Sequence, residues 1–237
     1  AAPVDRGAIE AAAHGVFPSG PGERSWRVDV VDANGARAAD DAVDAAAADL
    51  TARLMRHRVR RIGGHRLLVT GPPPLPDTLG KRLRVWPEGV VPPPTLDQDT
   101  TMVAAAGAAA GVARLMGARV VIPTGSTGSL DTDLAAKADA ARGAIAAGAC
   151  HVVVHIGAPD EAGHLRDAGA KAAAIERIDH ELLRPIAKIV TETRGTLRVC
   201  ADHGCDPRTG SHDDSPVPCL DWTPERSGSA HPRRLTE

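Results

Sequence analysis

Five side chains that could bind metal ions gather in two short segments, each of which follows an apolar run at residues 151–156 or 196–201. These candidate ligands are Asp160, His164, Asp202, His203 and His212. Carboxylate oxygens and imidazole nitrogens suit Zn²⁺ or Mn²⁺, and two such ions about 3.5–4 Å apart can hold a phosphoryl group from both sides. An Asp-His pair after a strand is also common in turns and helix caps, so the prediction depends on both segments meeting.

The order of helices and strands around these segments favours such a meeting. The predicted elements are a helix over 102–116, a strand over 119–122, a helix over 131–147 with Asp131 as its N-cap, a strand over 151–156, a helix over 168–193 and a strand over 196–201. Short apolar strands that alternate with helices are typical of a parallel sheet, whose strands share one carboxyl edge. We therefore expect an α/β fold with the candidate ligands at that edge.

The N-terminal part of the chain has a pattern of its own. It contains a predicted strand over 27–31, a helix over 39–57 and a strand over 66–70, followed by proline-rich stretches at 71–76 and 87–94. Proline cannot continue a helix or a central strand, so these stretches are read as linkers. We expect residues 22–90 to form a small α/β domain that is joined to a larger one.

Composition excludes several classes of protein. The 237 residues include 28 basic and 30 acidic side chains, a net charge of −2, which gives no field to attract nucleic acid or an anionic membrane. No apolar run approaches the roughly 20 residues that span a bilayer, and the N-terminus has no signal-peptide pattern. These features favour a cytoplasmic protein without a nucleic-acid or membrane partner, and they leave its oligomeric state open.

The four cysteines do not form a recognisable framework. Cys150, Cys200, Cys205 and Cys219 lack the paired Cys-x-x-Cys spacing of a zinc ribbon. A chain of this size can build a core without disulfides, so we expect reduced thiols.

Around the candidate ligands, the sequence resembles the archaeal-type cofactor-independent phosphoglycerate mutases of the alkaline phosphatase superfamily. The specific matches are Ala-Pro-Asp-Glu-Ala-Gly-His at 158–164 and Ala-Asp-His-Gly at 201–204, with further matches at 6–11, 27–31, 65–69, 124–128, 131–133 and 215–218. The resemblance implies an alkaline-phosphatase-like parallel-sheet catalytic domain, formed by residues 1–21 and the metal-binding residues 91–237. Residues 22–90 would then be a smaller inserted α/β domain that caps the substrate. The resemblance further implies two divalent metal ions, Mn²⁺ or Zn²⁺, and the interconversion of 3-phosphoglycerate and 2-phosphoglycerate through a phosphoenzyme.

The resemblance also implies roles for individual residues. Asp160, His164 and His212 would hold one metal ion, while Asp202 and His203 would contribute to the second. The small phosphorylated carboxylic acid would be bound by Arg27, Arg66 and Lys137. The Ser or Thr that becomes phosphorylated in this family is expected upstream of Ala1.

Other functions stay open at this stage. A related metal-dependent phosphatase or phosphonate-pathway enzyme is the first alternative, because Val28 and Asp29 stand where the family usually has Cys and Asn. A catalytically silent homologue that lacks the nucleophile segment is the second. The Gly-rich segment 124–128 could hold a phosphate, but it lacks the Gly-Lys-Ser/Thr of a P-loop and is also consistent with a plain turn.

Overall fold

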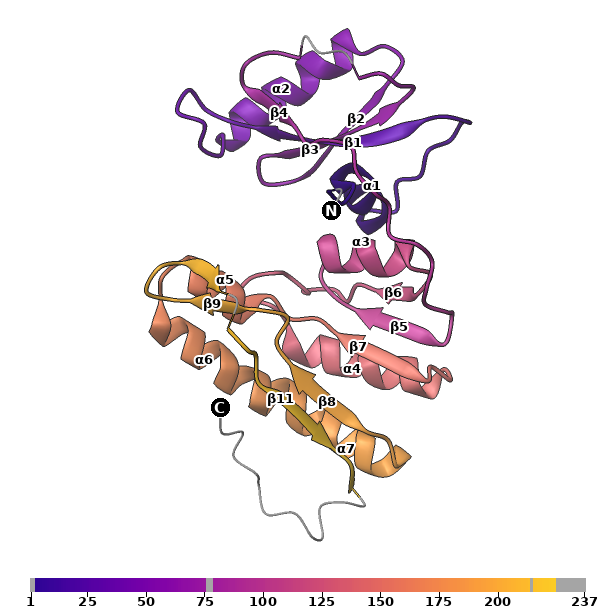
Figure 1. The fold of residues 1–237 in the computed structure, drawn as a ribbon, viewed down its shortest axis with the longest axis vertical. Helices are drawn as coiled ribbons and strands as arrows, with labels where there is room; N and C mark the ends of the chain where they lie inside the picture. Colours follow the sequence, from indigo (N-terminus) through magenta and orange to yellow (C-terminus); the bar gives the residue numbers. More distant parts are fainter. Residues whose placement is uncertain (1–2, 76–78, 214, 225–237) are drawn as a thin grey trace. The chain divides into compact units, whose positions relative to one another are not determined.

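The computed structural model describes residues 3–75, 79–213 and 215–224 (Figure 1). These residues divide into two compact units. The first falls within residues 1–98 and 106–120, and the second within 99–105 and 121–237. All five candidate metal ligands belong to the second unit.

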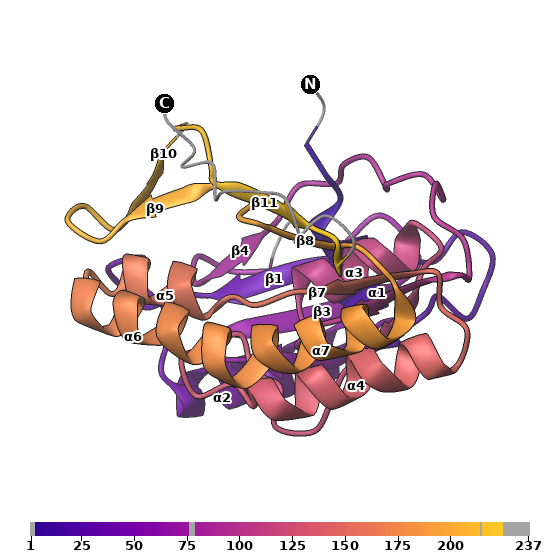
Figure 2. The same ribbon diagram turned by 90° about the horizontal axis from the view of Figure 1, so that it is seen from below.

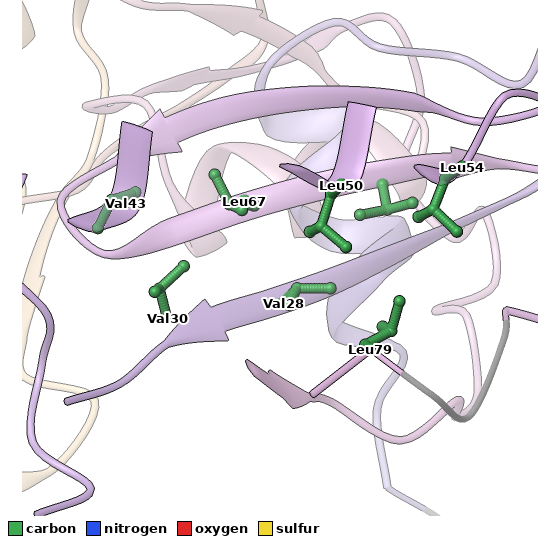
Figure 3. Close-up of a cluster of buried hydrophobic side chains, with 8 residues drawn as sticks. Val28, Val30, Val43, Leu50, Leu54, Leu67 and Leu79 are labelled. Atoms are coloured by element: carbon green, nitrogen blue, oxygen red, sulfur yellow. The ribbon is translucent and has the colours of Figure 1, made fainter. Parts of the chain in front are cut away.

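The first unit contains an antiparallel sheet of four strands in the order β2-β3-β1-β4. The strands are β1 (Arg24–Val30), β2 (Arg58–Gly63), β3 (Arg66–Gly71) and β4 (Leu83–Val85). Helix α2 (Asp40–Arg53) covers one face of this sheet, where Val43 and Leu50 of the helix pack against Val28 and Leu67 of the strands (Figure 3). All four of these side chains have no exposed surface, so this cluster is the core of the unit.

Helix α1 (Arg6–Ala13) packs against β1 and β3 of this sheet and against α3 (Ala108–Leu115). Two glycines allow this close approach. A Cβ atom on Gly7 would lie 1.9 Å from the carbonyl oxygen of Ser25 in β1, and one on Gly111 would lie 2.1 Å from that of Ile9 in α1. Any larger residue at these positions would push the elements apart.

The second unit contains the parallel strands of the fold. Strands β5 (Thr100–Val103) and β7 (His151–Val154) pair in parallel, with Val103 opposite Val154. Helix α4 (Leu134–Ala146) packs on both strands, and its Leu134 and Ala138 meet Leu182 in a buried cluster. Strand β6 (Arg119–Val121) lies at the division between the units. The α/β class predicted from the sequence is confirmed.

A long helical run follows in the second unit. Helix α6 (Ala168–Ile178) continues through a π-helical segment, η1 (Asp179–Leu183), into α7 (Arg184–Thr193), beside which α4 lies (Figure 2). The predicted helix over 168–193 is therefore correct in extent. In the described residues no helix combines the length and the apolar composition needed to cross a membrane.

The remaining elements carry or border the candidate ligands. Helix α5 (Ala158–His164) follows β7, and β8 (Leu197–Cys200) pairs antiparallel with β11 (Cys219–Trp222). Strands β9 (Gly204–Asp206) and β10 (Ser211–Asp213) form a hairpin. Figure 1 shows β9 beside α5, in agreement with their contacts.

Three sequence-based predictions of local structure were wrong. The predicted helix over 102–116 starts only at Ala108, because the preceding residues 100–103 form the buried strand β5. The N-cap of α4 is Asp133, which accepts a hydrogen bond from the amide of Ala136, and not Asp131. The segment after β7, read as a loop, forms α5, which has Pro159 in its first turn, where proline is tolerated.

Candidate metal centre

Helix α5 places Asp160 and His164 on one side of the helix, because residues four positions apart are neighbours on a helical surface. The Oδ2 atom of Asp160 lies 3.4 Å from Nε2 of His164. Both side chains are about two-fifths exposed, 39% and 41%, so an ion can reach them from solvent.

The hairpin β9–β10 brings His212 to the same place. His212 lies opposite Cys205 in the hairpin, and α5 packs against β9. The Nε2 atom of His212 lies 3.1 Å from Oδ1 of Asp160 and 3.1 Å from Nε2 of His164. Residues 52 and 48 positions apart in sequence therefore meet at one point.

These three side chains fit a divalent metal ion. Ligand atoms around a tetrahedral Zn²⁺ are about 3.3 Å apart when each bond is about 2.0–2.1 Å. The three distances in this cluster, 3.1, 3.1 and 3.4 Å, are close to that value. They join both carboxylate oxygens of Asp160 to the Nε2 atoms of His164 and His212, and these two Nε2 atoms to each other.

The tautomer of His164 is set by its other nitrogen. Its Nδ1 atom lies 2.9 Å from the carbonyl oxygen of Gly210, in the turn of the hairpin. A carbonyl can only accept, so Nδ1 must donate and Nε2 keeps its lone pair for a metal ion. Gly210 has φ of +73°, a conformation that favours glycine.

Asp202 and His203 lie between β8 and β9. The ring of His203 stacks on that of His212 with a centroid distance of 3.8 Å, so this pair borders the three-residue cluster. Asp202 accepts a hydrogen bond from the amide of His203, and its Oδ2 lies 3.6 Å from Nε2 of His203. The two residues offer one carboxylate and one imidazole for a second ion, fewer than the four ligands that Zn²⁺ usually takes.

Sequence reasoning missed two residues near this cluster, Cys205 and His155. Cys205 places Sγ within 4.8 Å of the ligand atoms of Asp160, His164 and His212. Burial raises the pKa of its thiol, with a further contribution from Asp160. A Cβ atom on Gly163 would lie 2.5 Å from this sulfur, so Cys205 also fills the contact between α5 and β9.

Lys137, predicted to bind substrate, lies on α4 with no exposed surface. Its ammonium donates a hydrogen bond of 2.7 Å to the carbonyl oxygen of His155, just after β7, and burial lowers its pKa. Burial also lowers the pKa of His155, helped by Lys137 and opposed by Asp202 and Asp160. Lys137 therefore adds positive charge close to the end of β7, where the metal-binding segment begins.

Arg27 and Arg66 belong to the first unit and meet at Glu10 of α1. The Oε1 atom of Glu10 lies 3.1 Å from Nη1 of Arg27 and 3.4 Å from Nη1 of Arg66. Arg27 also donates two hydrogen bonds to Asp29, of 2.8 and 3.2 Å. In this structure both guanidinium groups are thus paired with carboxylates of the chain.

The Gly-rich segment 124–128 is a turn with internal hydrogen bonds. The amide of Ser126 donates to the carbonyl of Pro123, and the amide of Thr127 donates to Oγ1 of Thr132. Amides that bind phosphate must point outward and be free. The plain-turn interpretation of this segment is therefore favoured.

Residues 97–235, more than half of the chain, match the profile of the Metalloenzyme superfamily. The chain belongs to this superfamily. The match covers the whole of the three-residue cluster, and membership of the superfamily implies that the chain binds divalent metal.

Curated relatives agree with the resemblance seen in the sequence. The chain is 36% identical over 122 residues to the 2,3-bisphosphoglycerate-independent phosphoglycerate mutase of Methanopyrus kandleri. This alignment covers 52% of the chain and 29% of that enzyme. The chain is also 40% identical over 100 residues to the 2,3-bisphosphoglycerate-independent phosphoglycerate mutase 2 of Methanothermobacter thermautotrophicus. That alignment covers 40% of this chain and 24% of the relative. The matched regions thus span less than a third of these relatives.

A solved structure shows the same fold. The PH0037 protein from Pyrococcus horikoshii superposes with a TM-score of 0.77, covering 92% of this chain and 68% of that one, at 21% identity. The expected alkaline-phosphatase-like α/β architecture is therefore confirmed at the level of fold.

The contact between α5 and β9 gives a test of how the ligands are positioned. We expect Gly163→Ala to weaken Zn²⁺ binding about 10-fold or more, because the new Cβ would displace Cys205 and with it the strand that carries the hairpin. Gly143→Ala in α4 is the matched control, since nothing lies within 4 Å of its Cβ position. Titration of both variants with a chromophoric zinc chelator measures the effect. Equal affinities would show that α5 and β9 do not need to be in contact.

Proposed function

We propose that this chain carries the metal-binding part of a two-metal phosphotransferase that interconverts 3-phosphoglycerate and 2-phosphoglycerate through a phosphoenzyme. The observation that carries the proposal is the meeting of Asp160, His164 and His212 from a helix and a distant hairpin. The names of the relatives support the choice of substrate.

Different residues of the chain would bind the two metal ions of this reaction. Asp160, His164 and His212 would hold one Mn²⁺ or Zn²⁺ ion, and Asp202 with His203 would contribute to the other. Bound there, the ions would neutralise charge on the phosphoryl oxygens and lower the pKa of an attacking hydroxyl. Gly210 keeps His164 in the tautomer that can bind metal.

We further propose that positive side chains bind the acid. Lys137 would favour a negatively charged ligand near the end of β7, where its buried charge has few other partners to offset it. Arg27 and Arg66 would release Glu10 or Asp29 and bind the carboxylate or phosphate of the substrate in its place. Because Arg is planar and offers several donors, such an exchange keeps the same hydrogen-bond geometry.

One observation favours the alternative of a related metal-dependent phosphatase. Asp29 accepts hydrogen bonds from Nε and Nη2 of Arg27, the two donors that would otherwise bind a substrate carboxylate. An enzyme that holds its substrate mainly by the phosphate would not need that arginine. Transfer to water would then replace transfer back to glycerate.

The products of the reaction distinguish these functions. Full-length protein is incubated with 3-phosphoglycerate in Mn²⁺ and in Zn²⁺, and the products are identified by phosphorus NMR. We expect 2-phosphoglycerate, and expect none of it from His164→Ala. Inorganic phosphate alone would favour the phosphatase. Metal binding without either product would contradict both and indicate a catalytically silent homologue.

A further inference from the structure

Two cysteines that the metal centre does not use face each other across an antiparallel strand pair. In the pairing of β8 with β11, Cys200 is the direct partner of Cys219. Both are free thiols, and both residues are exposed. Their separation of 19 positions in sequence gives no sign of this pairing.

The two side chains lie on the same face of the strand pair. Side chains alternate along a strand, so Cys200 shares its face with Arg198, and Cys219 shares its face with Asp221. Arg198 is the direct partner of Asp221, and their side chains form hydrogen bonds of 2.7 and 2.8 Å. This ion pair crosses the same face of the strand pair on which the two thiols lie opposite each other.

The electrostatics of Arg198 agree with that placement. Asp221 is the main cause that raises the pKa of Arg198, and Cys219 and Cys200 act in the same direction. Both sulfur atoms therefore lie near one guanidinium group.

Directly opposed residues suit a disulfide. Opposed residues in an antiparallel pair have Cα atoms about 4.5 or 5.5 Å apart, depending on the hydrogen-bond pattern. A disulfide needs a Cα separation of about 4.4–6.8 Å, so either kind of pair is within range. The backbone of β8 and β11 need not move far for the bond to form.

We propose that Cys200 and Cys219 form a reversible redox site, oxidised to a cross-strand disulfide by small-molecule disulfides. One thiolate attacks the small disulfide, which gives a mixed disulfide and releases one thiol. The other cysteine then displaces the second thiol and closes the Cys200–Cys219 bond. The small disulfide gains the two electrons, and the protons of the two protein thiols end on the two released thiols.

The bond would enclose the segment that carries three of the five candidate metal ligands. Asp202, His203 and His212 all lie between the two cysteines, and Asp202 comes two residues after Cys200. Closing such a loop restricts the unfolded chain and ties the ends of the segment together. Because both cysteines are exposed, small thiols could reach the bond and reduce it again.

Mass spectrometry of the metal-free protein tests this proposal. The protein is treated with excess oxidised glutathione in the presence of EDTA, quenched in acid, digested and mapped. We expect one peptide pair linked through Cys200 and Cys219, which disappears on treatment with dithiothreitol. The matched control is Cys150→Ser, which removes the other exposed cysteine and should leave the linkage unchanged.

Single substitutions separate the two steps. In Cys200→Ser we expect Cys219 to keep a glutathione adduct, because no neighbouring thiol can displace it, and Cys219→Ser should give the converse. Lasting adducts on both cysteines of the wild-type protein would overturn the proposal, as would no reaction at either. The experiment contains neither metal nor substrate, so its outcome is independent of the proposed phosphotransferase activity.

Discussion

Replacing His164 by Ala is expected to weaken Zn²⁺ binding by at least about 100-fold, because even residues that only orient a metal ligand contribute 10–100-fold. His164 supplies Nε2 to the cluster, 3.1 Å from His212 and 3.4 Å from Asp160. Its removal leaves one carboxylate and one imidazole, which bind Zn²⁺ poorly alone. The fold should be retained, since the side chain is 41% exposed.

The matched control is His151→Ala. His151 is also an exposed histidine of the second unit, but it begins β7, whereas the cluster follows the end of that strand. Competition with a chromophoric chelator gives the affinity of each variant, and circular dichroism checks the fold. If His164→Ala bound Zn²⁺ as tightly as His151→Ala, the cluster would not be the metal site.

Much of this centre could be predicted from sequence because local spacing determines it. Asp160 and His164 are four residues apart, and any helix brings such a pair together, even though the segment was read as a loop. The apolar runs before the two segments also indicated where strands end. These signals depend only on neighbouring residues.

The rest depended on contacts between distant residues. Nothing near His212 shows that it sits on a hairpin whose turn holds the tautomer of His164, because that hydrogen bond joins residues 46 positions apart. The run of small residues at 104–110 led to the prediction of a helix that included Met102 and Val103. In the structure these two residues form a strand, because they pair in parallel with β7. Strand pairing and packing override local propensity in this mostly buried segment.

Two arginines show the same limit. Their likeness to the family indicated substrate binding for both Arg27 and Arg66, but sequence does not reveal that Glu10 of α1 reaches them. The structure gives them different surroundings. The Arg27 side chain is 14% exposed and faces two carboxylates, while that of Arg66 is 34% exposed and faces one.

Replacing Arg27 by Met is therefore expected to destabilise the first unit by about 3–5 kcal/mol, the cost of removing one partner from a buried ion pair. Glu10 and Asp29 are 2% and 6% exposed, so water cannot take the place of the guanidinium. The same change at Arg66, which is more exposed and pairs with Glu10 at 3.4 Å, should cost about 1 kcal/mol or less. Both variants lose one positive charge and gain the same side chain, so their difference reports the burial of each arginine and the number of carboxylates that it faces.

The pH dependence gives this prediction a second, independent measurement. Burial opposes ionisation of Asp29, but hydrogen bonds from Arg27 and Trp86 outweigh it and lower the pKa of Asp29 from its usual 3.8. Asp29 therefore stabilises the native protein above that pH, and its contribution is lost as the pH falls through the lowered value. In Arg27→Met the hydrogen bonds from Arg27 are lost, so burial should raise the pKa of Asp29. Protonation of Asp29 in acid should then remove an unfavourable buried charge from the variant, whereas in the wild type it removes a stabilising one.

Urea unfolding at pH 7 and at about pH 3 measures both effects, with Trp26 and Trp86 of the first unit as fluorescent reporters in a Trp222→Phe background. We expect the difference in unfolding free energy between wild type and Arg27→Met to shrink at the lower pH. A difference at pH 7 no larger than that of Arg66→Met would mean that the Glu10–Arg27–Asp29 cluster is hydrated in solution. Arg27 would then be free to meet a substrate anion without first releasing its carboxylate partners.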